Sequence, residues 1–128
     1  MIFIPKALNK KKRNITISKK ELKDFEIKVK SLYENKHIKS PIHLSGNNDS
    51  QLIKIVSLIS KEDYVFSTWR SHYHALRHGI PKEQILSMIL SGKSMSISSK
   101  NFNFYSSSIV GGCVPIALGT ALALKKKK

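Results

Sequence analysis

The chain has 128 residues, 41% of them hydrophobic, and its 23 lysine and arginine residues against 8 acids give a formal net charge of +15. This length allows one domain or part of one and excludes a complete two-domain enzyme, while the apolar content argues against disorder throughout. A single cysteine, Cys113, excludes an intramolecular disulfide and a cysteine-based zinc cluster.

The positive charge is concentrated at the two ends of the chain. Residues 1–20 hold seven cations and no acid, and residues 125–128 are all lysine. Residues 21–124 hold 12 cations and 8 acids, a net charge of only +4. We therefore expect residues 1–17 to form a mobile basic arm and residues 18–128 to form the folded part. A basic chain also suggests an alternative function, the binding of nucleic acid or an anionic membrane.

The first predicted element is a helix over residues 19–34. Ser18 and Glu21 have the S-x-x-E spacing of a capping box, in which each side chain accepts a free amide at the helix start. Apolar side chains then recur at helical spacing and form one face; they are Leu22, Phe25, Val29 and Leu32.

Two more helices are predicted on either side of the chain's midpoint. Asp49 or Ser50 can cap the earlier one, and its inward side chains are Leu52, Ile55, Val56 and Ile59. The later one begins at Pro81, a residue suited to the first helical turn, and ends near Gly92. Its inward side chains are Ile85, Met88 and Ile89.

Between these helices, an apolar stretch over residues 64–66 precedes a helix predicted over residues 69–78. Ser67 or Thr68 can cap this helix, and Gly79 supplies the position that ends it.

This helix carries the densest group of polar side chains in the chain. Arg70 and His72, near its start, can hold an anion such as a diphosphate. His74 and His78 are four residues apart, as metal ligands sometimes are, but no third ligand has a suitable spacing. Partly exposed histidines on a half-buried helix explain this pair better.

Seven of the sixteen residues from 93 to 108 are serine, so we expect a loop there. A Gly111–Gly112 turn follows, where the backbone can approach a ligand closely. Pro115 then begins a final helix that is apolar all round and is expected to be buried on every side, with Cys113 as a small buried residue. As a membrane anchor, residues 109–124 fall short of the ~20 needed to span a bilayer.

Three separated stretches, residues 32–45, 64–79 and 103–123, occur in an order that resembles a known family. They are similar to the alpha subunit of thiamine-diphosphate-dependent 2-oxo acid dehydrogenases, the decarboxylating components of pyruvate dehydrogenase-type complexes. Residues 109–115, which read I-V-G-G-C-V-P, look like the I-V-G-x-x-V-P pattern of that family. The resemblance extends over residues 22–124.

The resemblance implies an α/β fold in which helices flank a parallel sheet. This chain would hold its N-terminal, mostly helical part and would be truncated. It also implies that the aromatic–arginine pair Trp69 and Arg70 meets the cofactor's diphosphate and that His43 and His72 act in catalysis. The backbone of Ser108 and Val110 would meet the aminopyrimidine ring.

The function implied by the resemblance is oxidative decarboxylation of a 2-oxo acid, pyruvate before a branched-chain acid or acetoin, with transfer of the acyl group to lipoamide. The cofactor would be thiamine diphosphate with magnesium. The partners would be a beta subunit, in a heterotetramer, and a lipoyl-bearing acyltransferase, rather than nucleic acid or a membrane. The location would be the cytoplasm, or the mitochondrial matrix in a eukaryote.

Two departures from the family pattern affect these expectations. The family follows its H-L pair with a G-Q-E-A-like segment, where residues 46–51 read G-N-N-D-S-Q. The Gly-Asp-Gly magnesium motif, expected just after the final helix, does not occur in the sequence, so we assign no metal ligand. We therefore expect the isolated chain to bind the cofactor weakly or not at all and to be inactive, and a catalytically inactive remnant is a further alternative.

Overall fold

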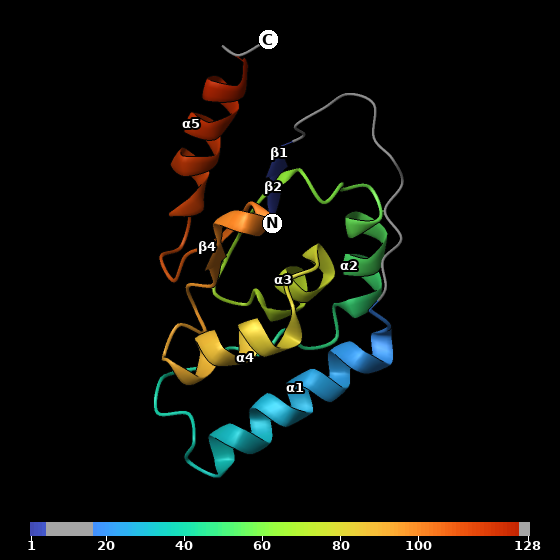
Figure 1. Ribbon diagram of the computed structural model, residues 1–128, viewed down its shortest axis with the longest axis vertical. Helices are drawn as coiled ribbons and strands as arrows, with labels where there is room; N and C mark the ends of the chain where they lie inside the picture. Colours follow the sequence, from blue (N-terminus) through green and yellow to red (C-terminus); the bar gives the residue numbers. More distant parts are fainter. Residues whose placement is uncertain (5–16, 126–128) are drawn as a thin grey trace.

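The computed structural model describes residues 1–4 and 17–125. Helices and strands alternate irregularly along the chain, and helices predominate, in agreement with an α/β assignment (Figure 1). The helices are α1 (Lys19–Glu34), α2 (Asp49–Val56), α3 (His72–His78), α4 (Lys82–Leu90) and α5 (Cys113–Lys125), with a 3-10 helix at Lys100–Phe102. The strands are β1 (Ile2–Ile4), β2 (Tyr64–Ser67), β3 (Ser98–Ser99) and β4 (Phe104–Ser106).

The four strands form one mixed sheet in the order β1-β2-β4-β3. β2 and β4 are parallel, with Val65 opposite Phe104 and Ser67 opposite Ser106, while β1 and β3 pair with their neighbours in antiparallel orientation. The wholly parallel sheet implied by the resemblance is therefore reduced to one parallel pair among the described strands. Because β2 and β4 run the same way, their carboxyl ends lie side by side.

β1 corrects the prediction that the basic arm begins at the first residue. Residues 2–4 pair with β2, with Ile2 opposite Phe66 and Ile4 opposite Tyr64. The open edge of β2 presents backbone donors and acceptors that an added strand can satisfy. Ile17, the last residue of the predicted arm, is buried in the hydrophobic core, and residues 5–16 lie outside the described residues.

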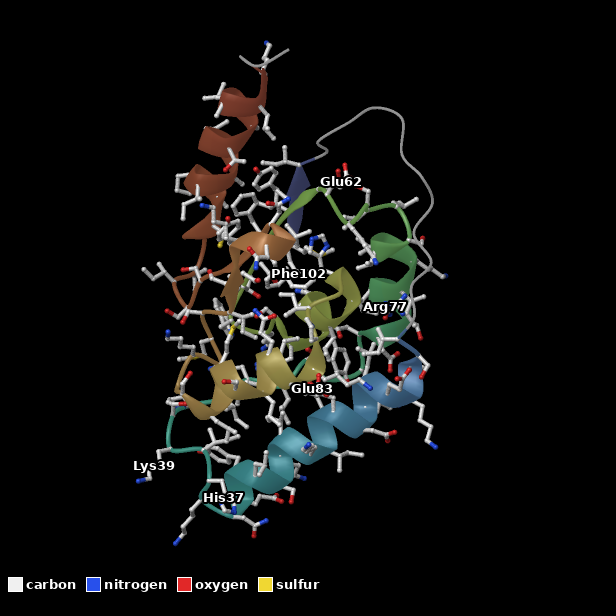
Figure 2. All side chains as sticks on the ribbon, viewed as in Figure 1. His37, Lys39, Glu62, Arg77, Glu83 and Phe102 are labelled. Atoms are coloured by element: carbon white, nitrogen blue, oxygen red, sulfur yellow. The ribbon has the colours of Figure 1, made fainter. Side chains whose placement is uncertain are left out.

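A hydrophobic cluster lies between the sheet and the helices α1 to α4, which gather on the same side of the molecule (Figure 1). The predicted inner face of α1 is confirmed, because Leu22, Phe25 and Val29 are buried and Leu32 packs against the cluster. Arg77 is also buried, between α2 and α3, and donates a hydrogen bond to the carbonyl of Ile17 (Figure 2). This hydrogen bond joins α3 to the segment just before α1.

The predicted capping box at the start of α1 is present. Ser18 Oγ accepts from the amide of Glu21, and the amide of Ser18 donates to Glu21 Oε2 at 2.8 Å. The hydrogen bond from the Ser18 amide, followed by that from Lys82, lowers the pKa of Glu21 to about 2. The carboxyl group of Glu21 therefore stays ionised as a cap well below neutral pH.

Replacing the capping serine tests this arrangement. We expect Ser18→Ala to lower the free energy of unfolding by about 1 kcal/mol, because a free amide at the start of α1 loses its acceptor. Ser87→Ala is the control, since Ser87 is an exposed residue inside α4 and alanine is a better helix former than serine. Urea unfolding of both variants at pH 7 measures the difference, and equal stabilities would contradict it.

The starts of α2 and α3 differ from the prediction. α2 follows Asn48, and Asp49 is not a cap; its buried carboxylate lies 3.0 Å from Lys19 Nζ on α1. α3 begins at His72, three residues later than predicted, with Ser71 at its N-cap, since β2 extends to Ser67 and residues 68–71 form the turn between them. Ile55, predicted to face inward, is 45% exposed, since α2 turns Leu52 and Val56 toward the cluster.

The serine-rich stretch expected to be a loop contains β3, a 3-10 turn and β4. The side chain of Phe104 on β4 is fully buried in the cluster. Every backbone pairing of β4 comes from strands distant in sequence or from β3, so the serine content of the segment conceals a strand that its partners stabilise.

The final helix, α5, begins at Cys113 and contacts β1 and β2 on the side of the molecule away from α1 (Figure 1). The prediction that it is buried on every side is wrong for the described residues. Only Ala117 is buried, whereas large apolar side chains are more than half exposed; these are Val114, Ile116, Leu118 and Leu122. A helix apolar all round meets the sheet along one narrow face, because the described part of the chain holds no second layer to cover it. None of the described helices combines the length and apolar content needed to cross a membrane.

Candidate functional site

The carboxyl ends of the neighbouring strands β2 and β4 lie together at one end of the sheet, which is called the carboxyl edge below. The turn over residues 68–71 leaves β2 at this edge, and the turn over residues 107–112 leaves β4 beside it. In open α/β sheets, ligands bind outside the carboxyl ends of parallel strands. Four of the six predicted site residues lie in these two turns, namely Trp69, Arg70, Ser108 and Val110.

A fifth predicted residue, His43, is brought to the same edge from the loop before α2. Its ring lies edge-on to Trp69, with 6.3 Å between ring centroids and an interplanar angle of 64°. Arg70 Nη1 donates to the carbonyl oxygen of Leu44 at 2.9 Å. Two segments 26 residues apart are thus joined: exposed Arg70 follows Trp69 directly in the sequence, and its acceptor Leu44 follows His43.

The turn after β4 is tightly folded around Gly112. A Cβ at that position would lie 2.9 Å from Ser107 Oγ and 3.1 Å from the Cβ of Ile109, so a larger residue would displace the turn. Ser107 Oγ also accepts from the amide of Ile109 at 3.1 Å. Ser108 and Val110 are exposed on this turn. Among the described residues, no hydrogen bond or ring contact joins them to Trp69 or Arg70.

A pocket of about 200 Å³ lies between the end of β2 and the turn after β4. Its walls are mostly apolar, with a serine, a threonine and a thiol among them. The lining residues are Met1, Ile2, Phe66, Ser67, Thr68, Ile109, Gly111, Cys113 and Val114. The edge is therefore hollowed where the two turns meet.

His72, the sixth predicted residue, does not reach this edge. Its side chain is fully buried; its Nε2 lies 2.9 Å from Ser94 Oγ, and its ring packs edge-on against Phe25. Burial lowers the pKa of His72 to about 4. The imidazole is therefore neutral at pH 7 and serves the packing between α1 and α3 in this arrangement.

Sequence reasoning missed a polar network just beneath the edge. His74 Nδ1 lies 2.5 Å from Ser67 Oγ, Ser71 donates to Ser106 at 3.2 Å, and Cys113 Sγ donates to the carbonyl of Ser67. These contacts tie β2, β4, α3 and α5 together under the two turns. The serines at the strand ends could have indicated this network, but the strands whose pairing brings them together are distant in sequence.

The predicted exposure of His78 and burial of Cys113 also need correction. His78 is 2% exposed, and its Nε2 lies 2.7 Å from the carbonyl oxygen of Phe102. Cys113 is only partly buried. His78 is buried because the 3-10 helix covers it. Cys113 stays partly exposed because α5 is covered on one narrow face only.

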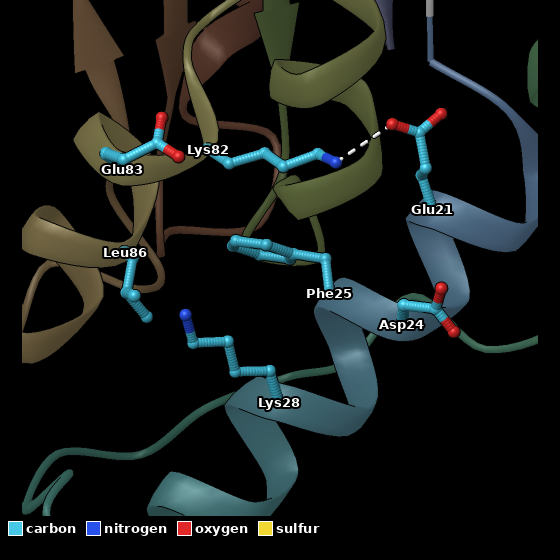
Figure 3. A pocket seen from close by; sticks show the side chains of 7 residues that line it. All are labelled: Glu21, Asp24, Phe25, Lys28, Lys82, Glu83 and Leu86. Atoms are coloured by element: carbon cyan, nitrogen blue, oxygen red, sulfur yellow. Dashed lines mark hydrogen bonds and ion pairs between the residues drawn. The ribbon is translucent and has the colours of Figure 1, made fainter.

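Another pocket, of about 220 Å³, lies between α1 and α4 and contains no predicted site residue (Figure 3). Lys82 and Glu21 form an ion pair at 3.0 Å across it, so much of its charge is internally balanced. Its lining residues are Glu21, Asp24, Phe25, Lys28, Lys82, Glu83 and Leu86. The described part of the chain contains no group of three or more histidine, cysteine, aspartate or glutamate side chains placed to hold a metal ion.

Residues 18–128 match the family described as "Dehydrogenase E1 component". The chain belongs to this family. It is 30% identical to the mitochondrial pyruvate dehydrogenase E1 component subunit alpha of Sminthopsis macroura, over 79% of this chain and 30% of that subunit. It is 27% identical to the corresponding subunit of Porphyra purpurea, over 77% of this chain and 32% of the relative.

The mitochondrial subunit alpha-1 of Arabidopsis thaliana is 29% identical, over 91% of this chain and 35% of that subunit. The resemblance to alpha subunits of 2-oxo acid dehydrogenases is thus confirmed for this E1 family member. The chain spans about a third of the length of these relatives. Those relatives are mitochondrial where their names give a compartment, and a further Arabidopsis relative is chloroplastic.

Proposed function

We propose that this chain supplies the alpha-subunit side of a thiamine-diphosphate site in a dehydrogenase that oxidatively decarboxylates a 2-oxo acid, pyruvate in the first instance. The acyl group would pass to lipoamide on an acyltransferase component. The observation that carries the proposal is at the carboxyl edge of β2, where the Leu44 carbonyl holds the exposed Arg70 and where His43 contacts Trp69.

The residues at this edge fit the chemistry of the cofactor. Arg70 uses one nitrogen for Leu44, and the guanidinium has further N–H donors that suit a forked contact with a phosphate. Trp69, the preceding residue, supplies an aromatic ring, and Ser108 and Val110 are exposed residues on the neighbouring turn. When bound, thiamine diphosphate supplies the electron sink for decarboxylation.

Each of the chain's own groups then has a defined task. Arg70 binds and orients the diphosphate, and Trp69 shields that contact from water. His43, half-buried against Trp69, can hold or move a proton on the substrate side. His72, which the resemblance makes catalytic, would first have to leave its buried contact with Ser94, so we assign the proton-handling role to His43.

Magnesium and the protein partners complete the proposal. We assign no magnesium ligand to the described residues. A beta subunit in a heterotetramer would provide the other side of the cofactor site, and the lone chain would bind the cofactor weakly and show no turnover. The location would be the cytoplasm, or the mitochondrial matrix in a eukaryote.

A titration followed by NMR tests the role of Arg70, because this method detects weak binding. With magnesium present, thiamine diphosphate is expected to shift the indole N–H signal of Trp69, the only tryptophan in the chain. Arg70→Ala is expected to weaken binding at least about tenfold, since a hydrogen bond to a charged group contributes roughly 1.5–3 kcal/mol. Lys61→Ala, which removes another exposed cation, is the control.

Equal shifts in the Arg70→Ala variant and the unaltered chain would contradict the proposed contact. The same samples test the alternative of a basic nucleic-acid-binding protein. Binding of duplex DNA through the basic ends would fall steeply as salt is raised and would leave the Trp69 signal in place. A DNA interaction with that salt dependence, combined with no response to thiamine diphosphate, would replace the proposed function by the alternative.

A further inference from the structure

The loop that carries His43 lacks a backbone scaffold of its own. Within the described part of the chain, no backbone–backbone hydrogen bond involves residues 38–45. The amide of His37 closes the end of α1, and the amide of Asn48 bonds to Gly46 just before α2. The position of His43 therefore depends on side chains that reach this loop from other elements.

One of these side chains is Glu26, on α1. Its carboxylate accepts a hydrogen bond from the backbone amide of Ser45 and another, at 2.9 Å, from the hydroxyl of Tyr73 on α3. Hydrogen bonds to an ionised acceptor are about twice as strong as bonds between neutral groups. Burial, followed by the hydrogen bond to Glu26, raises the pKa of Tyr73, so its hydroxyl keeps the proton that it donates.

Ser45 is separated from His43 by a single residue, and that residue also has an external partner. The Leu44 carbonyl accepts from Arg70, while His43 contacts Trp69. The three residues are thus held at successive points: by Glu26 at Ser45, by Arg70 at Leu44, and by Trp69 at His43. The contact with Glu26 is made by the backbone amide of Ser45 and not by its hydroxyl, which is buried and has no hydrogen-bond partner among the described residues.

We propose that Glu26 is a positioning residue of the candidate site: by holding the Ser45 amide, it keeps His43 and the Leu44 carbonyl against Trp69 and Arg70, with Tyr73 fixing the carboxylate. This inference rests on the proposed function, because it gives the loop position a purpose. Glu26 does not touch the substrate or the cofactor in this scheme. It acts through the loop.

The surroundings of Glu26 make it accessible to substitution. An open pocket of about 250 Å³ runs beside it, so the carboxylate is not sealed in the core. The lining of this pocket includes two lysines of α1 and apolar side chains from α1 and the loop. The lining residues are Lys23, Glu26, Ile27, Lys30, Leu44, Gly46, Asn47 and Tyr73.

The test measures the loop directly in the full chain. In Glu26→Ala, we expect the Ser45 amide to exchange with solvent about tenfold faster or more, as follows from losing a charged acceptor. Acrylamide should also quench Trp69 fluorescence more strongly, because His43 no longer covers the indole. In Glu26→Gln, the side-chain oxygen can still accept from Ser45, so we expect much of both properties to be restored.

Two further variants separate positioning from general stability. Glu34→Ala removes an exposed carboxylate from the same helix, where it pairs only loosely with Lys30, and should leave Ser45 exchange and Trp69 quenching unchanged. Tyr73→Phe removes the second hydrogen bond of Glu26 and should give an intermediate increase. If Glu26→Ala fails to fold, the Tyr73→Phe result decides the proposal.

Failure of this inference can be distinguished from failure of the proposed function. Wild-type exchange at Ser45 and wild-type quenching of Trp69 in Glu26→Ala, or in Tyr73→Phe if that variant decides, would overturn the positioning role, whatever the cofactor does. If Glu26→Ala alters Ser45 exchange and Trp69 quenching but the unaltered chain shows no response to thiamine diphosphate, the positioning role of Glu26 is confirmed and the proposed function is overturned. Loss of the Trp69 shift in Glu26→Ala, with rescue in Glu26→Gln, would support both.

Discussion

Lowering the pH from 7 to 5 is expected to reduce the free energy of unfolding by about 4 kcal/mol, because two histidines, one fully and one partly buried, resist protonation. His72 is fully buried beside Phe25 and Ser94, and the partly buried His74 lies against Ser67. Burial lowers the pKa of each to about 4, and the amino group of Met1 contributes further at His74. A reduction of 4 kcal/mol is a large share of the 5–15 kcal/mol typical of a folded domain.

The direction follows from proton uptake. An unfolded histidine takes up its proton near pH 6.5, whereas these two stay neutral in the fold until about pH 4. Between those values the unfolded state binds more protons, so stability rises with pH. The contribution is complete above pH 6.5 and is lost as the pH falls toward 4. Each histidine accounts for about half of the change.

Urea unfolding in steps from pH 7.5 to 5 measures this dependence. His74→Gln should show about half of the decrease, because one of the two titrating groups is gone. His37→Gln should show the full decrease, since His37 is exposed at the end of α1, far from the core (Figure 2). A free energy of unfolding that is flat from pH 7 to 5 would contradict the neutral state of both histidines in the fold.

A second loss of stability belongs to a lower pH range and has a different cause. The pKa of Glu21 is lowered to about 2, chiefly by the amide of Ser18, and that of Asp49 is lowered by its hydrogen bond to Lys19. A carboxylate with a lowered pKa contributes stability above its unfolded pKa and loses it on further acidification. Restricting the histidine experiment to pH 5 and above keeps the two effects apart.

The parts of the fold that could be predicted are those that local sequence determines. Ser18 and Glu21 cap α1 from three residues apart, and Gly79 ends α3 in a left-handed conformation, as its lack of a Cβ allows. β4 could not be predicted in the same way, since its pairing comes from strands that are distant along the chain or too short to detect.

In the candidate site, too, the residues with local signals could be predicted and the contacts between distant segments could not. Trp69 and Arg70 stand out within a short motif, but the bond from Arg70 to Leu44 links segments 26 residues apart. The Glu26 contacts with Ser45 and Tyr73 span 19 and 47 residues. His72 was predicted from the same motif as Arg70, yet it faces the opposite way, because the first turn of α3 directs it into the core.

Truncating Phe104 is expected to be the most damaging single substitution in the sheet. This ring is fully buried on β4, 6.0 Å from the ring of His78, and belongs to the hydrophobic cluster. Phe104→Ala should lower the free energy of unfolding by about 3–5 kcal/mol, because the lost burial is compounded by a cavity that the neighbours fill only in part. β4 is also the parallel neighbour of β2, so the same change should loosen both turns of the candidate site.

Phe104→Leu and Leu118→Ala are the matched comparisons. Leucine keeps most of the apolar volume and should recover a large part of the lost stability. Leu118 is 61% exposed on α5, so its truncation should change the free energy of unfolding by less than about 0.5 kcal/mol. Urea unfolding at pH 7 orders the three variants. If Leu118→Ala were as damaging as Phe104→Ala, α5 would have to be covered in solution, and the assignment of the core to the side of the sheet facing α1 would be incomplete.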